Sequence, residues 1–278
     1  MQSPADRRSF EELVGDRDLT TSPARAGSML LQVARWLSRF VSANVVLVVS
    51  AVISAGVLIG LTAASAEVYE AVSQGDGMAG LDRPALELAI GARNPGIVEA
   101  VNVYTQLGGP WWMPVIAGLV TVAITIWLRS RTPLILMLIG VAGSLLMTGV
   151  GKAVVGRVRP PAVDAVPPYD STPSFPSGHT LNSTVIAALV AYLLLLRLTS
   201  TLARVLAVGG AVLWFTTMGL SRVFLGHHWL SDVAMGWTLG LGWVAAVITT
   251  HRLFLTVRRL RADNGSNRTL LRSDGPAE

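Results

Sequence analysis

The stretch that decides the fold is LILMLIGVAGSLLMTGV at residues 134–150, which carries no charged side chain and is followed directly by Gly151 and Lys152. An α-helix rises about 1.5 Å per residue, so about 17 to 25 apolar residues cross the roughly 30 Å hydrocarbon core of a bilayer. The run therefore predicts a membrane-spanning helix. The polar residues that follow it are expected at one surface of the membrane.

Five further apolar runs of comparable length lie on either side of this one. They occupy residues 44–64, 112–128, 181–196, 205–220 and 233–250. Of the 278 residues in the chain, 51% are hydrophobic and only 14% are charged, a composition typical of integral membrane proteins. We therefore predict an all-α fold, an integral membrane bundle of six transmembrane helices at 44–250, with tails at 1–43 and 251–278.

The arginines indicate how the bundle is oriented. If the chain crosses the bilayer six times, most arginines outside the spans fall on one side: Arg25, Arg35, Arg39, Arg129, Arg131, Arg197, Arg204, Arg252, Arg258, Arg259 and Arg261. The positive-inside rule assigns that side to the cytoplasm. We expect a multi-pass protein of the cell (plasma) membrane with both termini cytoplasmic. The loop at 66–110 would then form a short extracytoplasmic cap, with helical spacing at 85–90 and 97–107.

Three polar clusters lie where apolar runs end on the predicted extracytoplasmic side. The chain contains no cysteine, so thiolate nucleophiles, thiolate metal ligands and disulfides are excluded. The last cluster contains His228 and Asp232, four residues apart, which share a face if the sixth span is helical there. The carboxylate would then fix one ring nitrogen of the histidine and leave the other free as a nucleophile or base.

The other clusters supply an anion site. Ser177, Gly178 and His179 precede the fourth span, so that the N–H groups at its start can face an anion, with a histidine beside it that has a proton to give. The cations that would join them are Lys152, Arg159 and Arg222. Three cations in one outer pocket suit the oxygens of a phosphoryl group in transfer. The residues predict phosphoryl transfer without a metal or any other cofactor.

The chain resembles the type-2 phosphatidic acid phosphatase superfamily, whose signature reads K-x6-R-P, P-S-G-H and S-R-x5-H-x3-D. The matching segments here are residues 152–160, 176–179 and 221–232. The resemblance implies that His228 is the nucleophile, that Asp232 orients it and that His179 is the general acid. It also implies that the phosphate is bound by Lys152, Arg159, Ser177, Gly178 and Arg222.

The expected function is hydrolysis of a phosphorylated lipid at the extracytoplasmic face through a phosphohistidine. Phosphatidic acid, phosphatidylglycerophosphate and a polyprenyl diphosphate all remain compatible substrates. The expected partners are this substrate and membrane lipids but no nucleic acid, and the oligomeric state stays open. Two other classes are kept as alternatives. One is an oxidoreductase like the vanadium haloperoxidases, which share the signature, and the other is a lipid carrier that performs no hydrolysis.

Overall fold

The computed structural model describes residues 13–14, 17–18, 56 and 77–273. The chain divides into two units, one of residues 56–245 and one that combines residues 1–55 with 246–278. In the latter, the two-residue strands β1 (Leu13–Val14) and β2 (Arg17–Asp18) pair antiparallel. The predicted first span at 44–64 lies outside the described residues, except for Gly56.

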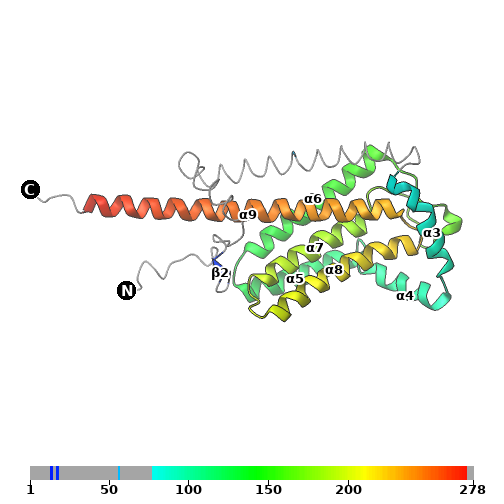
Figure 1. Cartoon of the computed structure of the whole chain (residues 1–278), viewed down its shortest axis with the longest axis horizontal. Helices are drawn as coiled ribbons and strands as arrows, with labels where there is room; N and C mark the ends of the chain where they lie inside the picture. The colour runs from blue at the N-terminus through cyan, green and yellow to red at the C-terminus, as the bar shows by residue number, and fades with distance from the viewer. Residues whose placement is uncertain (1–12, 15–16, 19–55, 57–76, 274–278) are drawn as a thin grey trace, which may run out of the picture. The chain divides into compact units, whose positions relative to one another are not determined.

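All the motif residues lie in the unit of residues 56–245, and the regular secondary structure of its described part is helical. The elements in chain order are η2 (Gly77–Leu81), α3 (Asp82–Gly91), α4 (Pro95–Gln106), α5 (Trp112–Leu128), α6 (Thr132–Val155), η3 (Ala162–Asp164), α7 (Gly178–Leu195), α8 (Thr201–Phe224) and α9 (Leu230–Ser273). Helix α9 begins in this unit and continues without a break into residues 246–273 (Figure 1).

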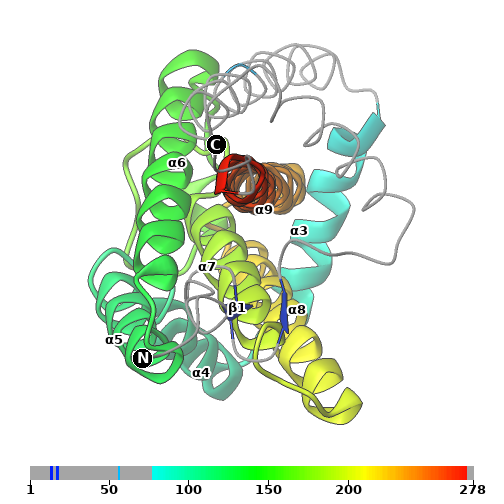
Figure 2. The same ribbon diagram turned by 90° about the vertical axis from the view of Figure 1, so that its left-hand side faces the viewer.

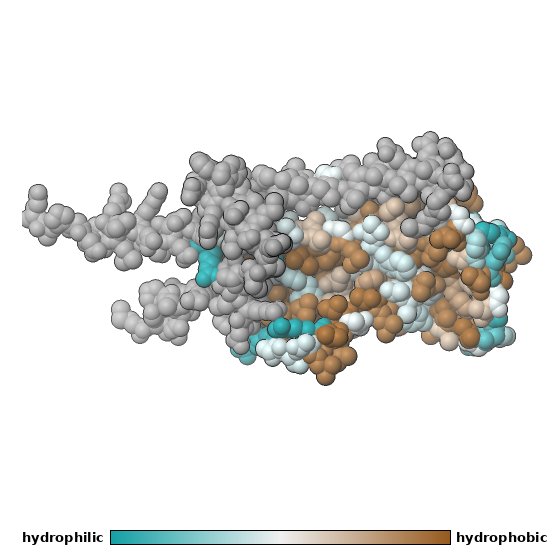
Figure 3. Space-filling model, viewed as in Figure 1, coloured by the Kyte–Doolittle hydropathy of each residue, from teal (hydrophilic) through white to brown (hydrophobic). Residues whose placement is uncertain are grey.

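Five of the six predicted spans are helices α5 to α9. Four helices in the described part of the chain are long and apolar enough to cross a membrane: α6, α7, α8 and residues 230–259 of α9. Helix α5 is apolar but shorter, at 17 residues. Figure 3 shows apolar residues spread along the visible side of the helices, with polar residues concentrated toward their ends. A multi-pass membrane protein follows from these helices, as the sequence predicts.

Helix α7 forms the core of the bundle. Its side chains Leu181, Val185 and Leu189 are spaced four residues apart and are completely buried. Such spacing places them on one face of the helix. The helix packs against α5, α6 and α8, and in the view of Figure 2 it lies between α6 and α8. Apolar side chains on the outer faces of α6 and α8 stay exposed, as a lipid environment allows.

Small residues allow the first part of α9 to approach its neighbours closely. A Cβ added at Gly219 of α8 would lie 2.7 Å from Val233, and one added at Gly236 of α9 would lie 2.9 Å from Thr180 of α7. The indole of Trp243 donates to the carbonyl of Gly140 in α6 at 3.0 Å. Close helix approach of this kind is characteristic of membrane bundles. It fixes the start of α9, and therefore Asp232, relative to α7.

Two loops and two short helices meet at one end of the bundle. The loop between α6 and α7 bonds the α8–α9 loop through the amide of Val166 and the carbonyl of Leu225, at 2.9 Å. Gly226 has φ +72°, and a Cβ there would lie 2.4 Å from the carbonyl oxygen of Asp164, so this crossing requires glycine. Arg93, between α3 and α4, donates to the carbonyls of Phe224 and Asp164. The helices α3 and α4 thus cover both loops (Figure 1).

Candidate active site

His228 and Asp232 form the centre of the site, as their spacing predicts. His228 precedes the first turn of α9 and Asp232 lies within that turn, and both side chains are buried. The Nδ1 atom of His228 lies 3.5 Å from Oδ2 of Asp232. Its Nε2 atom lies 3.2 Å from Nη1 of Arg159. Because a guanidinium can only donate, Nε2 is the unprotonated nitrogen and Nδ1 carries the proton toward the carboxylate.

The protonation state of His228 suits a nucleophile. Burial lowers its pKa to about 4, and the nearby charge of Arg159 acts in the same direction, whereas Asp232 opposes them. The ring is therefore neutral at physiological pH, and the lone pair of Nε2 accepts from Nη1 of Arg159. His227, its neighbour, bonds the carbonyl oxygen of Val166 through Nε2 at 2.6 Å, and burial likewise lowers its pKa to about 4. The structure thus gives the two adjacent histidines different surroundings.

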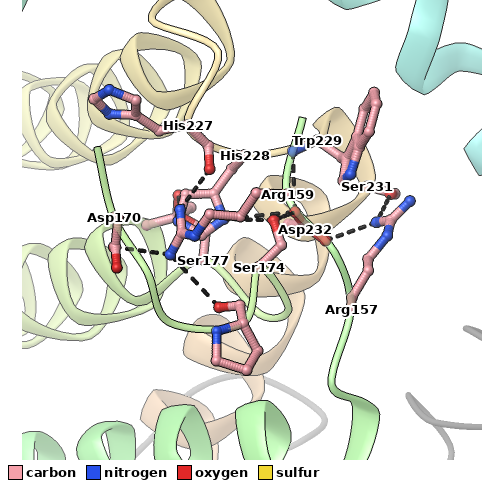
Figure 4. Close-up of polar contacts among 12 residues, drawn as sticks. Arg157, Arg159, Asp170, Ser174, Ser177, His227, His228, Trp229, Ser231 and Asp232 are labelled. Atoms are coloured by element: carbon pink, nitrogen blue, oxygen red, sulfur yellow. Dashed lines mark hydrogen bonds and ion pairs between the residues drawn. The ribbon is translucent and has the colours of Figure 1, made fainter. Parts of the chain in front are cut away.

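Arg159 connects His228 with the loop that precedes α7. Its Nε donates to the carbonyl of Thr172 at 2.7 Å, and its Nη2 donates to Oδ2 of Asp170 at 2.8 Å. Lys152, at the end of α6, bonds the same loop through Oγ1 of Thr172 and the carbonyl of Pro173. Lys152 and Arg159, two of the three signature cations, therefore both bind the loop at residues 172–173. Figure 4 shows Arg159 in the middle of these contacts, with Asp170 on one side and Asp232 on the other.

Arg222, near the end of α8, is buried and only partly satisfied. Its Nη1 donates to Oγ1 of Thr105 in α4 at 3.1 Å, while its Nε has no hydrogen-bond partner among the described residues. Lys152, Arg159 and Arg222 lie within electrostatic range of one another. One buried and two half-buried cations, with a donor of Arg222 left over, suit an anion.

Ser177, Gly178 and His179 lie at the start of α7, as predicted. Ser177 is the N-cap residue, and no side chain caps the helix there. The amide of Ser177 donates to the carbonyl of Asp232 at 3.2 Å, which joins this helix start to the His228–Asp232 pair. The His179 ring has no hydrogen-bond partner in the described part of the chain, and it lies within electrostatic range of Arg222 and His228. The amides at this helix start and the free imidazole ring suit an anion and a proton donor.

Sequence reasoning misses three residues that hold the site together. Ser174 is buried and donates to Oδ2 of Asp232 at 2.5 Å, and its hydroxyl also lies 3.3 Å from Nδ1 of His228. Arg157 donates to Oδ1 of Asp232 at 2.6 Å. Thr105 contacts both Ser221 and Arg222. Of these three residues, only Arg157 has a signal in the sequence, because it is a second arginine two residues before Arg159. Ser174 and Thr105 contact residues that are distant in the chain, so sequence spacing does not indicate them.

Comparisons with known proteins show which family this fold and sequence resemble. The sequence profile described as the PAP2 superfamily matches residues 133–255. Phosphatidylglycerophosphatase B of Bacillus subtilis (strain 168) is 29% identical over 163 residues, which cover 58% of this chain and 78% of that protein. The crystal structure of the first transmembrane PAP2-type phosphatidylglycerolphosphate phosphatase, also from Bacillus subtilis, matches with a TM-score of 0.57. It is 25% identical, and the match covers 70% of this chain and 92% of that chain. With all three signature segments present, residues 133–255 form a PAP2 superfamily domain, and the chain is similar to membrane phosphatases of that superfamily.

Proposed function

We propose that this protein hydrolyses the phosphate ester of a phosphorylated membrane lipid through a phosphohistidine on His228, at the extracytoplasmic face and without a metal. One observation carries the proposal. The Nδ1 side of His228 faces Asp232 while its Nε2 faces Arg159. The unprotonated nitrogen thus lies beside a cation that can bind the phosphate it attacks.

In the first step, Nε2 of His228 attacks phosphorus in line with the ester bond. The N–P bond forms as the P–O bond to the lipid breaks, and His179 donates a proton to the leaving oxygen. Asp232 stabilises the positive charge that develops on the His228 ring. Lys152, Arg159 and Arg222 carry the charge of the phosphoryl oxygens, together with the N–H groups at the start of α7.

In the second step, water attacks the phosphohistidine and releases inorganic phosphate. His179, deprotonated by the first step, accepts the proton of this water, and His228 returns to its neutral state. The three cations supply the positive charge that a metal ion provides in other phosphatases. We therefore expect turnover to be unaffected by a chelator.

Phosphatidylglycerophosphate is the substrate we propose first, because the names of the similar Bacillus sequence and of the similar Bacillus structure refer to this lipid. Its phosphomonoester presents a terminal phosphate that carries two negative charges near neutral pH, which the three cations can balance. A lipid substrate also fits a site at the end of a bundle whose flanks are apolar. Phosphatidic acid and a polyprenyl diphosphate form the comparison set.

The extracytoplasmic face follows from the arginine distribution and has its own test. Val163 lies in η3, in the loop between α6 and α7, and its side chain is 90% exposed. Since the natural chain has no cysteine, a Val163→Cys variant offers a single thiol. Intact cells treated with a membrane-impermeant thiol reagent should label it. Labelling that requires cell lysis would reverse the proposed orientation.

The function is tested by measuring phosphate release from each lipid by the purified protein in detergent with a chelator present. His227→Ala is the matched control for His228→Ala, because it removes the neighbouring imidazole from the same loop. We expect release that the His228 variant abolishes and the His227 variant only reduces. Near-normal release by His228→Ala would refute the proposal. Lipid movement that persists in His228→Ala would favour a carrier, and halide oxidation with added vanadate would favour the oxidoreductase.

A further inference from the structure

Asp82 lies far from the signature in sequence but reaches the site. It is the first residue of α3, outside the matched residues 133–255, and its side chain is buried. Its Oδ2 accepts hydrogen bonds from Nη2 of Arg157 at 2.6 Å and from Oγ of Ser231 at 2.7 Å. Its Oδ1 accepts the amide N–H of Ser231 at 2.8 Å. A buried carboxylate with this many donors is a fixed element of the structure.

Arg157 connects Asp82 with the catalytic carboxylate. One nitrogen of its guanidinium donates to Asp82, and the other donates to Oδ1 of Asp232 at 2.6 Å and to Oγ of Ser231 at 2.6 Å. The Trp229 ring packs against the guanidinium, with 5.7 Å between its centroid and Cζ. Burial lowers the pKa of Arg157, but Asp232 and Asp82 outweigh it and raise the pKa. Arg157 therefore remains a cation between two carboxylates.

The contacts of Asp232 show what this cation does. Arg157 donates to Oδ1 of Asp232. The other oxygen, Oδ2, accepts hydrogen bonds from the Ser174 hydroxyl and the Trp229 amide, and it faces Nδ1 of His228. Rotation of the carboxylate would break both sets of contacts together. Figure 4 shows Asp232 between Arg157 on one side and the Arg159 group on the other. The orientation of the pair that activates His228 is thus set from the side away from the phosphate cations.

We propose that Asp82 is a positioning residue for the nucleophile: it holds Arg157, which fixes the Asp232 carboxylate that orients His228. The inference rests on the proposed function, because it assumes that His228 attacks phosphorus. It extends the site beyond the superfamily signature to α3. No contact joins Asp82 to Lys152, Arg159 or Arg222 in the described structure, so it acts on the attack and not on phosphate binding.

The variant Asp82→Asn keeps the shape of the side chain and removes its charge. We expect kcat to fall about 10- to 100-fold, the usual range when a reacting group is displaced slightly, with KM changed by less than about twofold. The Nδ1–H resonance of 15N-labelled His228 should also move, because its hydrogen bond to Asp232 changes. Glu87→Gln is the matched control, since Glu87 is an exposed carboxylate of the same helix, paired with Arg83.

His228→Ala is measured in the same assay to separate the two proposals. Wild-type kcat in Asp82→Asn beside an inactive His228→Ala overturns the role of Asp82 alone. Full turnover in His228→Ala overturns the proposed function and this inference with it. A raised KM with unchanged kcat in Asp82→Asn also contradicts the inference.

A second variant answers the same question if Asp82→Asn does not fold. Arg157→Lys keeps the charge but replaces the two separate nitrogens that bind Asp82 and Asp232 with a single one. It should lower kcat over the same range and move the same resonance. Wild-type kcat in this variant would overturn the proposed linkage.

Discussion

Replacing Arg159 by lysine separates the charge of this residue from its shape. The wild-type guanidinium uses three nitrogens. Nε binds the carbonyl of Thr172, Nη2 binds Asp170, and Nη1 lies 2.5 Å from the carbonyl of His227 and 3.2 Å from Nε2 of His228. A lysine ammonium retains the positive charge. It has one nitrogen, which cannot reproduce the three separate contact points of the planar guanidinium.

The expected loss follows from these contacts. Removing one preorganised donor from a phosphoryl or oxyanion site costs about 100- to 1,000-fold in rate, and Arg159→Ala should fall in this range. Lysine retains the electrostatic attraction to the phosphate but loses the planar guanidinium and its hydrogen bonds to the loop. We therefore expect Arg159→Lys to lower kcat/KM about 10- to 100-fold, which corresponds to about 1.4 to 2.7 kcal/mol of transition-state stabilisation.

The assay is initial-rate phosphate release from phosphatidylglycerophosphate over a range of lipid fractions in mixed micelles. Arg83→Lys is the control, because Arg83 is exposed on α3 and its side chain pairs with Glu87. The control should match the wild type within about twofold. Wild-type kcat/KM in Arg159→Lys would show that charge alone suffices, and would refute the argument from the guanidinium contacts.

Three further predictions concern the catalytic pair and the helix packing around it. Ser174→Ala removes a donor to Asp232 and should lower kcat about tenfold at unchanged KM in the same assay; unchanged kcat would contradict this role. Since burial lowers the pKa of His228 to about 4 from an ordinary 6.5, its 15N NMR titration should have a midpoint near 4, and the folded state should lose stability as the pH falls from about 6.5 toward 4. A midpoint at 6.5 would show that the ring is solvated. Gly236→Ala places a Cβ 2.9 Å from Thr180 and should destabilise the protein by about 1 to 3 kcal/mol, whereas Gly210→Ala, with open space around it, should not; thermal unfolding in detergent compares the two, and equal Tm values would contradict the close packing of α7 and α9.

The sequence predicts the spanning helices because their signal is local. An unbroken apolar run fixes the existence of a helix such as α5, whose bounds of 112–128 match the prediction. Most ends of the other helices extend beyond the apolar runs. Helix α6 continues past residue 150 to Val155, because a helix does not need apolar residues where it leaves the membrane or packs on a loop. Hydropathy marks the apolar segment and not the end of the helix.

The site likewise contains residues that the sequence predicts and residues that it does not. The pairing of His228 with Asp232 follows from a spacing of four residues, and the start of α7 follows from an apolar run after Ser177 and Gly178. The residues that hold the site in place could not be predicted from the spacing of residues in the sequence. Thr105 and Ser174 contact signature residues, and Asp82 contacts Arg157, only after two loops and two short helices have come together at one end of the bundle. Each contact joins residues more than 50 positions apart, for which a single sequence provides no periodic signal.

The most direct measurement is the position of the phosphate on the trapped enzyme. Purified protein is mixed with lipid carrying a radiolabelled terminal phosphate, quenched in alkali, which preserves phosphohistidine, and analysed by mass spectrometry of its peptides. We predict that the phosphate is on Nε2 of His228, because Nδ1 faces Asp232. Phosphate on another residue, or on Nδ1, would contradict the account.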